Sequence, residues 1–203
     1  MPAPGFEEQS HPDNSRDHHL EELRIALDQT NPARILPPPM SPQARILDIG
    51  CGAGQSLIAA YPDRLSFGVD LDFDALKLGR SLTDRICFAA AKAEALPFRD
   101  GQFDMVFARV SLPYTNIALS LREIRRVLKR GGQIWLLLHR FGFLWGRART
   151  AGCRRKLFFL YIILNSLMFH FLRRQFSLFG RYESFQTTHG ISRALTESGF
   201  DEV

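Results

Sequence analysis

The clearest chemical signal in the sequence is an acid followed by glycines at alternate positions. The run ILDIGCGAGQ contains Asp48, Gly50, Gly52 and Gly54, and it ends at Gln55. Glycines at such a turn let the backbone leave a strand sharply and approach a ligand without a Cβ in the way. A dinucleotide-binding turn would need a further glycine where Gln55 stands. The run therefore predicts a ligand-binding turn and disfavours NAD as the ligand.

A second acid follows the next apolar stretch, FGVDLD, at Asp70. Together with Asp48 and the three glycines, which fit D-x-G-x-G-x-G at every fixed position, it resembles the class I S-adenosylmethionine-dependent methyltransferases. The resemblance implies that Asp70 accepts hydrogen bonds from both ribose hydroxyls of the cofactor, because a carboxylate offers two acceptor oxygens. It also implies that Leu71 packs on the adenine.

Three later motifs extend this resemblance in the family's order over about residues 45–138. AEALPF begins at Ala93, FDMVFAR at Phe103 and REIRRVLKRGG at Arg122, and all three are similar to the small-molecule, UbiE-like (type 11) branch. The resemblance implies a Rossmann-like α/β fold with a doubly wound, mostly parallel sheet. The cofactor-binding residues that it implies are Asp48, Gly50, Cys51, Gly52, Gly54, Gln55, Asp70, Leu71, Lys92, Ala93, Glu94 and Arg109.

Lys92 departs from the family pattern, which usually has an aspartate at this position to accept from the adenine amino group. A lysine side chain offers hydrogen-bond donors only. Three interpretations remain open. The backbone around Ala93 and apolar packing hold the adenine, or cofactor binding is weaker than usual, or the protein has lost turnover.

Methyl transfer from a sulfonium is a displacement that needs a positioned acceptor, and it needs a base only when the acceptor is protonated. The candidates are Tyr114, just after the predicted fourth strand, and His139, just after the predicted fifth. Local hydrogen bonding is the alternative role for each. Arg109 would face the cofactor's carboxylate, an anionic acceptor or solvent.

Short apolar runs alternate with helical stretches after Ser41, which is typical of parallel strands joined by crossover helices. We predict strands at residues 46–49, 65–69, 86–90, 103–108 and 134–138. The clearest helix covers residues 116–130, and Gly131 with Gly132 predicts its end. The family's sheet continues to two more strands. The sequence stops at Val203, so we expect these strands to be missing and the sheet edge to be open or completed by another chain.

The N-terminal residues 1–18 are polar and are predicted to be a disordered tail. We expect His11, His18 and His19 to be solvated and to bind no metal. A helix is predicted from Asp17, ending at the prolines 37–39 of a stiff linker. The methyltransferase domain would then cover residues 41–203, with a helical insertion at 140–190.

That insertion is basic and apolar. Thirteen of the 26 Lys and Arg residues lie between Ile124 and Tyr182, where no Asp or Glu occurs. Within it, Leu157 to Leu172 is nearly all apolar, yet shorter than the roughly 20 residues that span a bilayer. The polar residues that fall near one helical face are Tyr161, Asn165, Ser166, His170 and Arg173.

Three interpretations of this segment stay open: a buried lid or homodimerisation helix, a helix on an anionic membrane surface formed by residues 140–181, or a nucleic-acid contact. Apolar residues without interleaved charge disfavour nucleic acid.

The remaining composition is that of a globular chain, 45% hydrophobic, with a formal net charge of +5. Its three cysteines are too far apart to indicate a disulfide framework or a zinc site, and the N-terminus lacks a signal peptide. We therefore expect a cytoplasmic protein, peripheral to a membrane if the insertion meets lipid.

These observations predict an S-adenosylmethionine-dependent methyltransferase acting on a small, hydrophobic or lipid-like acceptor. The alternatives are a degenerate cofactor-binding or membrane-associated protein without turnover, and an RNA methyltransferase.

Overall fold

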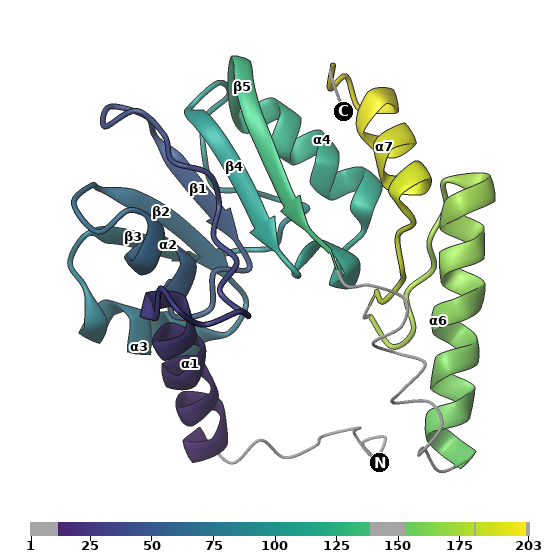
Figure 1. Cartoon of the computed structure of the whole chain (residues 1–203). Helices are drawn as coiled ribbons and strands as arrows, with labels where there is room; N and C mark the ends of the chain where they lie inside the picture. The colour runs from purple at the N-terminus through teal and green to yellow at the C-terminus, as the bar shows by residue number, and fades with distance from the viewer. Residues whose placement is uncertain (1–11, 139–152, 181, 202–203) are drawn as a thin grey trace.

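A computed structural model describes residues 12–138, 153–180 and 182–201 (Figure 1). The strands are β1 (Ile46–Ile49), β2 (Ser66–Asp70), β3 (Ile86–Ala90), β4 (Phe103–Arg109) and β5 (Leu128–Leu137). The helices are α1 (Pro12–Leu27), α2 (Gln55–Ala60), α3 (Phe73–Leu82), the 3₁₀ helix η1 (Leu112–Tyr114), α4 (Ile117–Val127), α6 (Cys153–Leu172) and α7 (Thr188–Glu197).

The strands form one sheet in the order β3-β2-β1-β4-β5, and all neighbouring strands are parallel. The chain builds outward from β1 to β3, then returns to the other side of β1 for β4 and β5. All strands therefore end at the same edge, and the crevice between β1 and β4 is the place where open α/β sheets bind ligands. The predicted doubly wound parallel sheet is confirmed, and the bounds of the first four strands differ from the prediction by no more than one residue.

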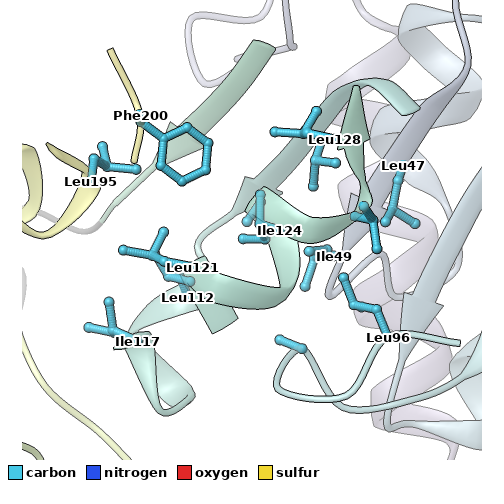
Figure 2. Close-up of a cluster of buried hydrophobic side chains, with 14 of the residues drawn as sticks. Leu47, Ile49, Leu96, Leu112, Ile117, Leu121, Ile124, Leu128, Leu195 and Phe200 are labelled. Carbon is cyan, nitrogen blue, oxygen red and sulfur yellow. The ribbon is translucent and has the colours of Figure 1, made fainter. Parts of the chain in front are cut away.

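Helices cover both faces of this sheet because successive side chains of a strand point to opposite faces. On one face, Ile46 packs with residues of α2 and α3. On the other, Leu47 and Ile49 belong to one buried cluster with residues of α4 and α7, and side chains of this cluster are drawn in Figure 2. The two buried clusters fix the sheet between the helices and leave its carboxyl edge as the natural position for a site.

The helix predicted over residues 116–130 ends earlier, at Val127. Leu128 has extended backbone angles, φ −74° and ψ 138°, and pairs with Phe103, so β5 begins where the helix was expected to continue. Gly131, with φ +74°, lies inside β5, close to the point where the register of the β4–β5 pair shifts. The prediction of a helix stop at Gly131 is wrong because this glycine serves an irregularity in the strand.

The N-terminal helix α1 begins at Pro12 rather than at Asp17. The prediction of a disordered tail over residues 1–18 is therefore wrong from Pro12 onward, and residues 1–11 lie outside the described part of the chain. The apolar periodicity of this segment is too weak to indicate a helix, and α1 is held instead by contacts with α2 and α3.

This helix also ends before the prolines that were expected to end it. After Leu27, the Asp28 carboxylate accepts from the N–H and the hydroxyl of Thr30, at 2.9 and 2.7 Å, and stabilises a turn. The proline linker that follows is tied to the domain by Tyr61, whose hydroxyl donates to the Pro38 carbonyl at 2.5 Å.

Beyond β5 the described chain contains α6 and α7 with a non-helical segment between them, and residues 153–180 and 182–201 contribute no strand to the sheet. α7 packs Ile191, Ala194 and Leu195 into the core beside α4, whereas α6 lies farther out, beyond α7 (Figure 1). In the described part of the chain, no helix combines the length and apolar character needed to cross a bilayer.

The core on the α4 side yields a packing prediction. Ile124 is fully buried on α4, and Leu119 on the same helix is 43% exposed. We expect Ile124→Ala to lower the free energy of unfolding by about 2 to 5 kcal/mol, because it leaves a cavity among well-packed side chains. The matched change Leu119→Ala should cost less than about 1 kcal/mol. Urea unfolding followed by circular dichroism measures both, and equal losses would contradict the packing described.

Candidate functional site

The glycine turn follows β1 directly and is tied to β2. The N–H groups of Gly50 and Cys51 donate to the Val69 carbonyl at 2.8 and 3.0 Å. Gly50, Gly52 and Gly54 have φ values of +73°, +53° and +83°. These left-handed values favour glycine, so the alternate glycines answer a backbone requirement of the turn.

The loop after β4 closes against this turn from the other side of the crevice. The Ser111 hydroxyl donates to the Ile49 carbonyl, and a Cβ on Gly50 would overlap the Ser111 side chain. Before it, Val110 has φ +67°, which is rare for a β-branched residue. Its N–H donates to the Leu137 carbonyl of β5 at 2.8 Å. The sequence did not indicate Ser111 or Val110, because their roles arise from contacts between loops far apart in the chain.

Asp48 lies beneath the turn and is only 2% exposed. Its Oδ1 atom has no hydrogen-bond partner. Burial raises the pKa of the Asp48 carboxyl well above its usual range, with the Arg109 charge opposing this and Asp70 adding to it. A buried carboxyl oxygen without a partner is costly unless a donor reaches it. Asp48 is therefore placed to receive a cationic group or a proton.

Asp70, at the end of β2, supports the turn and also faces the edge of the sheet. Its Oδ2 accepts from the Gly52 N–H at 2.7 Å, and its Oδ1 accepts from the Asp72 N–H at 2.9 Å. Each carboxylate oxygen has a second lone pair, and the side chain is partly exposed. The next residue, Leu71, is 68% exposed and presents apolar surface beside the carboxylate.

The segment after β3 provides backbone and apolar surface. Ala93 is buried, and Lys92 is exposed. The Glu94 carboxylate accepts from the Asn116 N–H at 2.7 Å, just before α4 begins. Glu94, which was expected among the cofactor contacts, thus helps to position α4.

Arg109, at the end of β4, joins the site to α1. It forms an ion pair with Glu22, and the two side chains are 20% and 30% exposed. The same guanidinium is the cation that favours the charged form of Asp48. The structure therefore engages Arg109 with two carboxylates of this chain rather than with solvent.

Helix α1 lies over the glycine turn. His19 Nδ1 and Gln55 Nε2 are 2.8 Å apart, and a Cβ on Gly52 would come within 3.0 Å of His19 Cε1. Burial lowers the pKa of the His19 imidazole, and the neighbouring His18 lowers it further. The prediction of a solvated His19 is wrong. The available signal was the spacing of His19 and Glu22, which places both on one helix face.

Among the remaining candidates, Tyr114 lies in η1, three residues after Ser111, and is 51% exposed. His139 falls outside the described residues. The Cys51 side chain is buried against Gly68, and burial raises the pKa of its thiol well above the usual range, so the side chain is turned away from the edge. Within residues 12–138, 153–180 and 182–201, no group of three or more His, Cys, Asp or Glu side chains could hold a metal ion.

The groups gathered at this edge of the sheet determine which kind of ligand it could bind. A buried acid lies under a turn without Cβ atoms, and a partly exposed carboxylate and an exposed leucine lie at the end of the next strand. This set fits a ligand that carries a cation, hydroxyl groups and a flat apolar ring.

Comparison with known proteins agrees with this geometry. The sequence profile of the family described as "Methyltransferase domain" matches residues 47–136. Over these residues, which are less than half of the chain, the protein is similar to methyltransferase domains. The match begins in β1 and ends in β5, so it contains the glycine turn, Asp70 and the loop after β4.

Two curated relatives and one solved structure illustrate this likeness. A ubiquinone/menaquinone biosynthesis C-methyltransferase of Rhizobium rhizogenes is 34% identical over 115 residues, covering 50% of this chain and 44% of the relative. A demethylmenaquinone methyltransferase of Roseiflexus castenholzii is 38% identical over 96 residues, covering 44% and 40%. The structure of the YcgJ protein of Bacillus subtilis matches with a TM-score of 0.54 at 21% identity, covering 89% of this chain and 68% of that one.

These matches cover only part of each curated relative. The chain spans less than half the length of the two curated relatives. The solved structure shares the fold over most of this chain.

The buried acid yields a prediction about pH. A carboxyl whose pKa is raised by folding contributes stability that is fully present below its unfolded pKa and is lost as the pH rises through the raised value. We expect Asp48→Asn, which cannot ionise, to weaken this decline and to raise the melting temperature most at the higher pH values. Thermal unfolding from about pH 5 to about pH 8 measures it.

The matched control is Asp63→Asn, because Asp63 is exposed in a loop. It should reproduce the wild-type profile. An Asp48→Asn variant with the wild-type slope would contradict a strained carboxyl at this position.

Proposed function

We propose that this protein is an S-adenosylmethionine-dependent methyltransferase that acts on a small, apolar acceptor. The observation that carries the proposal is the Asp48 carboxyl, buried beneath the glycine turn with Oδ1 unpartnered. Its Oδ1 atom can accept a hydrogen bond from a donor that the described side chains do not supply. The ammonium group of S-adenosylmethionine supplies one.

The other residues of the crevice fit the rest of the cofactor. Asp70 would accept from the two ribose hydroxyls through the free lone pairs of its oxygens. The exposed Leu71 and the Ala93 backbone would pack against the adenine. Gly50 and Gly52 are required by the packing of the chain itself, because a Cβ at either position would collide with Ser111 or His19.

When bound, the cofactor supplies an activated methyl group on a sulfonium. The chain's contribution is then to fix the acceptor in line with that methyl group and to exclude water. α1 covers the glycine turn through the Glu22–Arg109 ion pair and the His19–Gln55 contact, which suits it to the second task. Tyr114 is the described candidate for contacting the acceptor, because it lies exposed beyond the end of β4.

Two observations support an apolar acceptor. The relatives from Rhizobium rhizogenes and Roseiflexus castenholzii carry names from ubiquinone and menaquinone chemistry. In this chain, the segment after β5 contains the apolar helix α6, and its return loop contacts the rim of the site through Gln175, which accepts from the Ile117 N–H at 2.8 Å. An acceptor of the demethylated naphthoquinol type combines an apolar body with a nucleophilic ring carbon.

A second candidate function is cofactor binding without turnover. It is favoured by Lys92, which is exposed at the position where the family usually carries an acceptor for the adenine amino group. The two candidates differ in the outcome of a transfer assay and agree in predicting cofactor binding.

The binding claim is tested by titrating S-adenosylhomocysteine into the protein in a calorimeter. We expect Asp70→Asn to weaken binding by about 2 to 3 kcal/mol, roughly thirty- to a hundredfold, because it replaces a carboxylate acceptor with an amide that also donates. Asp63→Asn is the matched control and should bind like the wild type. Absence of heat and of thermal stabilisation in the wild type would refute the cofactor assignment.

The transfer claim needs a labelled methyl group. With S-adenosylmethionine carrying tritium in its methyl group, we expect label to enter reduced demethylmenaquinone-type acceptors and not water-soluble catechols or RNA. Tyr114→Phe should lower this rate by about ten- to a hundredfold if the Tyr114 hydroxyl contacts the acceptor. Its affinity for S-adenosylhomocysteine should equal that of the wild type. If the protein binds S-adenosylhomocysteine but transfers no label to the quinol-type acceptors, to catechols or to RNA, the result would favour cofactor binding without turnover.

A further inference from the structure

Helix α6 turns the polar side chains of Tyr161, Asn165 and Ser166 toward the protein, together with the apolar side chains of Ile162 and Phe169. Most of its other apolar side chains are exposed to solvent. Asn165 is fully buried, with Nδ2 donating to the Glu183 carbonyl at 2.9 Å and Oδ1 accepting from the Phe176 N–H at 3.0 Å. The Ser166 hydroxyl accepts from the Phe185 N–H at 2.7 Å. The predicted polar face of this helix therefore holds the segment that returns toward α7.

The opposite face is apolar and exposed. Its residues follow helical spacing, and their exposed fractions run from 39% to 69%. The members of this apolar face are Leu157, Leu160, Ile163, Leu164, Leu167 and Phe171. A lid buried by its apolar side, one of the alternatives left open by the sequence, does not fit this exposure. On an ordinary surface helix the apolar side chains face the protein and the polar side chains face solvent. An apolar helix face exposed to solvent therefore indicates a binding partner.

The charged residues around the apolar face indicate which class of partner it binds. The first turn of α6 contains Arg154, Arg155 and Lys156, and the helix is followed by Arg173 and Arg174. Arg173 pairs with Glu197 at 3.2 Å, whereas Arg174 is exposed. No Asp or Glu occurs from residue 124 to residue 182. The face thus combines apolar side chains in its middle with cationic residues at both ends of the helix.

We propose that the apolar face of α6 docks on the surface of an anionic lipid bilayer. Leucine and phenylalanine side chains would enter the boundary between headgroups and acyl chains, and the cations at both ends would meet lipid phosphates. A second copy of this chain fits less well, because pairing two such helices side by side brings cationic ends against cationic ends in either direction. A nucleic acid fits less well because the face offers leucines rather than stacking groups between the cations.

The return loop of α6 connects this helix to the edge of the sheet that contains the candidate site. Gln175 contacts the Ile117 N–H at the start of α4, and the Ser184 N–H donates to the Pro113 carbonyl of η1 at 3.1 Å. Both contacts lie beyond the end of β4, at the edge that contains the glycine turn. If the proposed function holds, bilayer docking would present an apolar acceptor to the rim of the site. The docking itself does not require turnover.

Flotation of the full chain with vesicles tests the proposal. Vesicles of phosphatidylcholine with phosphatidylglycerol are compared with vesicles of phosphatidylcholine alone. We expect the wild type to float with the anionic vesicles, to float less as salt is raised, and to remain largely unbound with the neutral ones. The double variant Leu164→Gln with Leu167→Gln should bind at least about tenfold more weakly, because two exposed apolar side chains no longer enter the bilayer.

A matched double variant distinguishes the face from general surface hydrophobicity. Leu27 and Leu65 are 54% and 55% exposed and lie elsewhere in the fold, so Leu27→Gln with Leu65→Gln should float like the wild type. Arg174→Gln should weaken binding to anionic vesicles only. Affinity for S-adenosylhomocysteine and the melting temperature, measured on the same variants, should match the wild type. They report on the cofactor site separately from the lipid surface.

Three outcomes would overturn the proposal. The wild type fails to float with either vesicle, or the Leu164/Leu167 variant floats like the wild type. In the third, sedimentation shows a dimer that this variant converts to a monomer while lipid binding is absent, which would assign the face to a second copy of the chain.

Discussion

The tight turn after β1 is the constraint on which the rest of the site depends. Three of its residues, Gly50, Gly52 and Gly54, hold left-handed backbone angles. That path brings the Gly50 and Cys51 N–H groups to the end of β2, so that the turn and the second strand form one rigid edge. It also leaves no room for a Cβ at Gly50 where Ser111 arrives from β4. Backbone contacts thus fix the edge of the sheet between β1 and β4. The side chains of the candidate site project from this fixed backbone.

A chain of charges follows from this scaffold. Asp48 is carried under the turn, where its ionised form loses hydration, and Arg109 is the nearby cation that offsets part of this cost. Arg109 is in turn paired with Glu22, so the position of α1 is linked to the buried acid through one guanidinium.

The sequence predicted the sheet and the acid–glycine turn well because both are local. A buried parallel strand is a short apolar run, and a turn that needs positive φ needs glycine, so β1 to β4 and Gly50 to Gly54 could be placed from residue types alone. It failed where a distant contact decides the structure. Helix α4 ends at Val127 because Leu128 pairs with Phe103, which local propensity does not report.

The same reason explains the parts of the site that sequence reasoning missed. His19 and Glu22 lie in a polar segment with weak periodicity, and their partners Gln55 and Arg109 are 36 and 87 residues away. Glu94 matched a family motif, yet its carboxylate serves the start of α4. A motif indicates which residues gather at the edge of the sheet. It does not indicate which of them form contacts within the fold instead of contacting a ligand.

Helix α6 shows how a polar requirement can determine which face of a helix is exposed. Residues 175–180 and 182–186 do not join the sheet, and their backbone groups need partners that a strand ladder would otherwise provide. Asn165, Ser166 and Tyr161 supply them, the last by donating to the Phe176 carbonyl at 3.1 Å. Turning the apolar face inward would break these bonds and leave buried backbone groups unsatisfied. The exposure of the leucines is therefore enforced by the hydrogen bonds on the opposite side of the helix, so the apolar face of α6 stays turned outward.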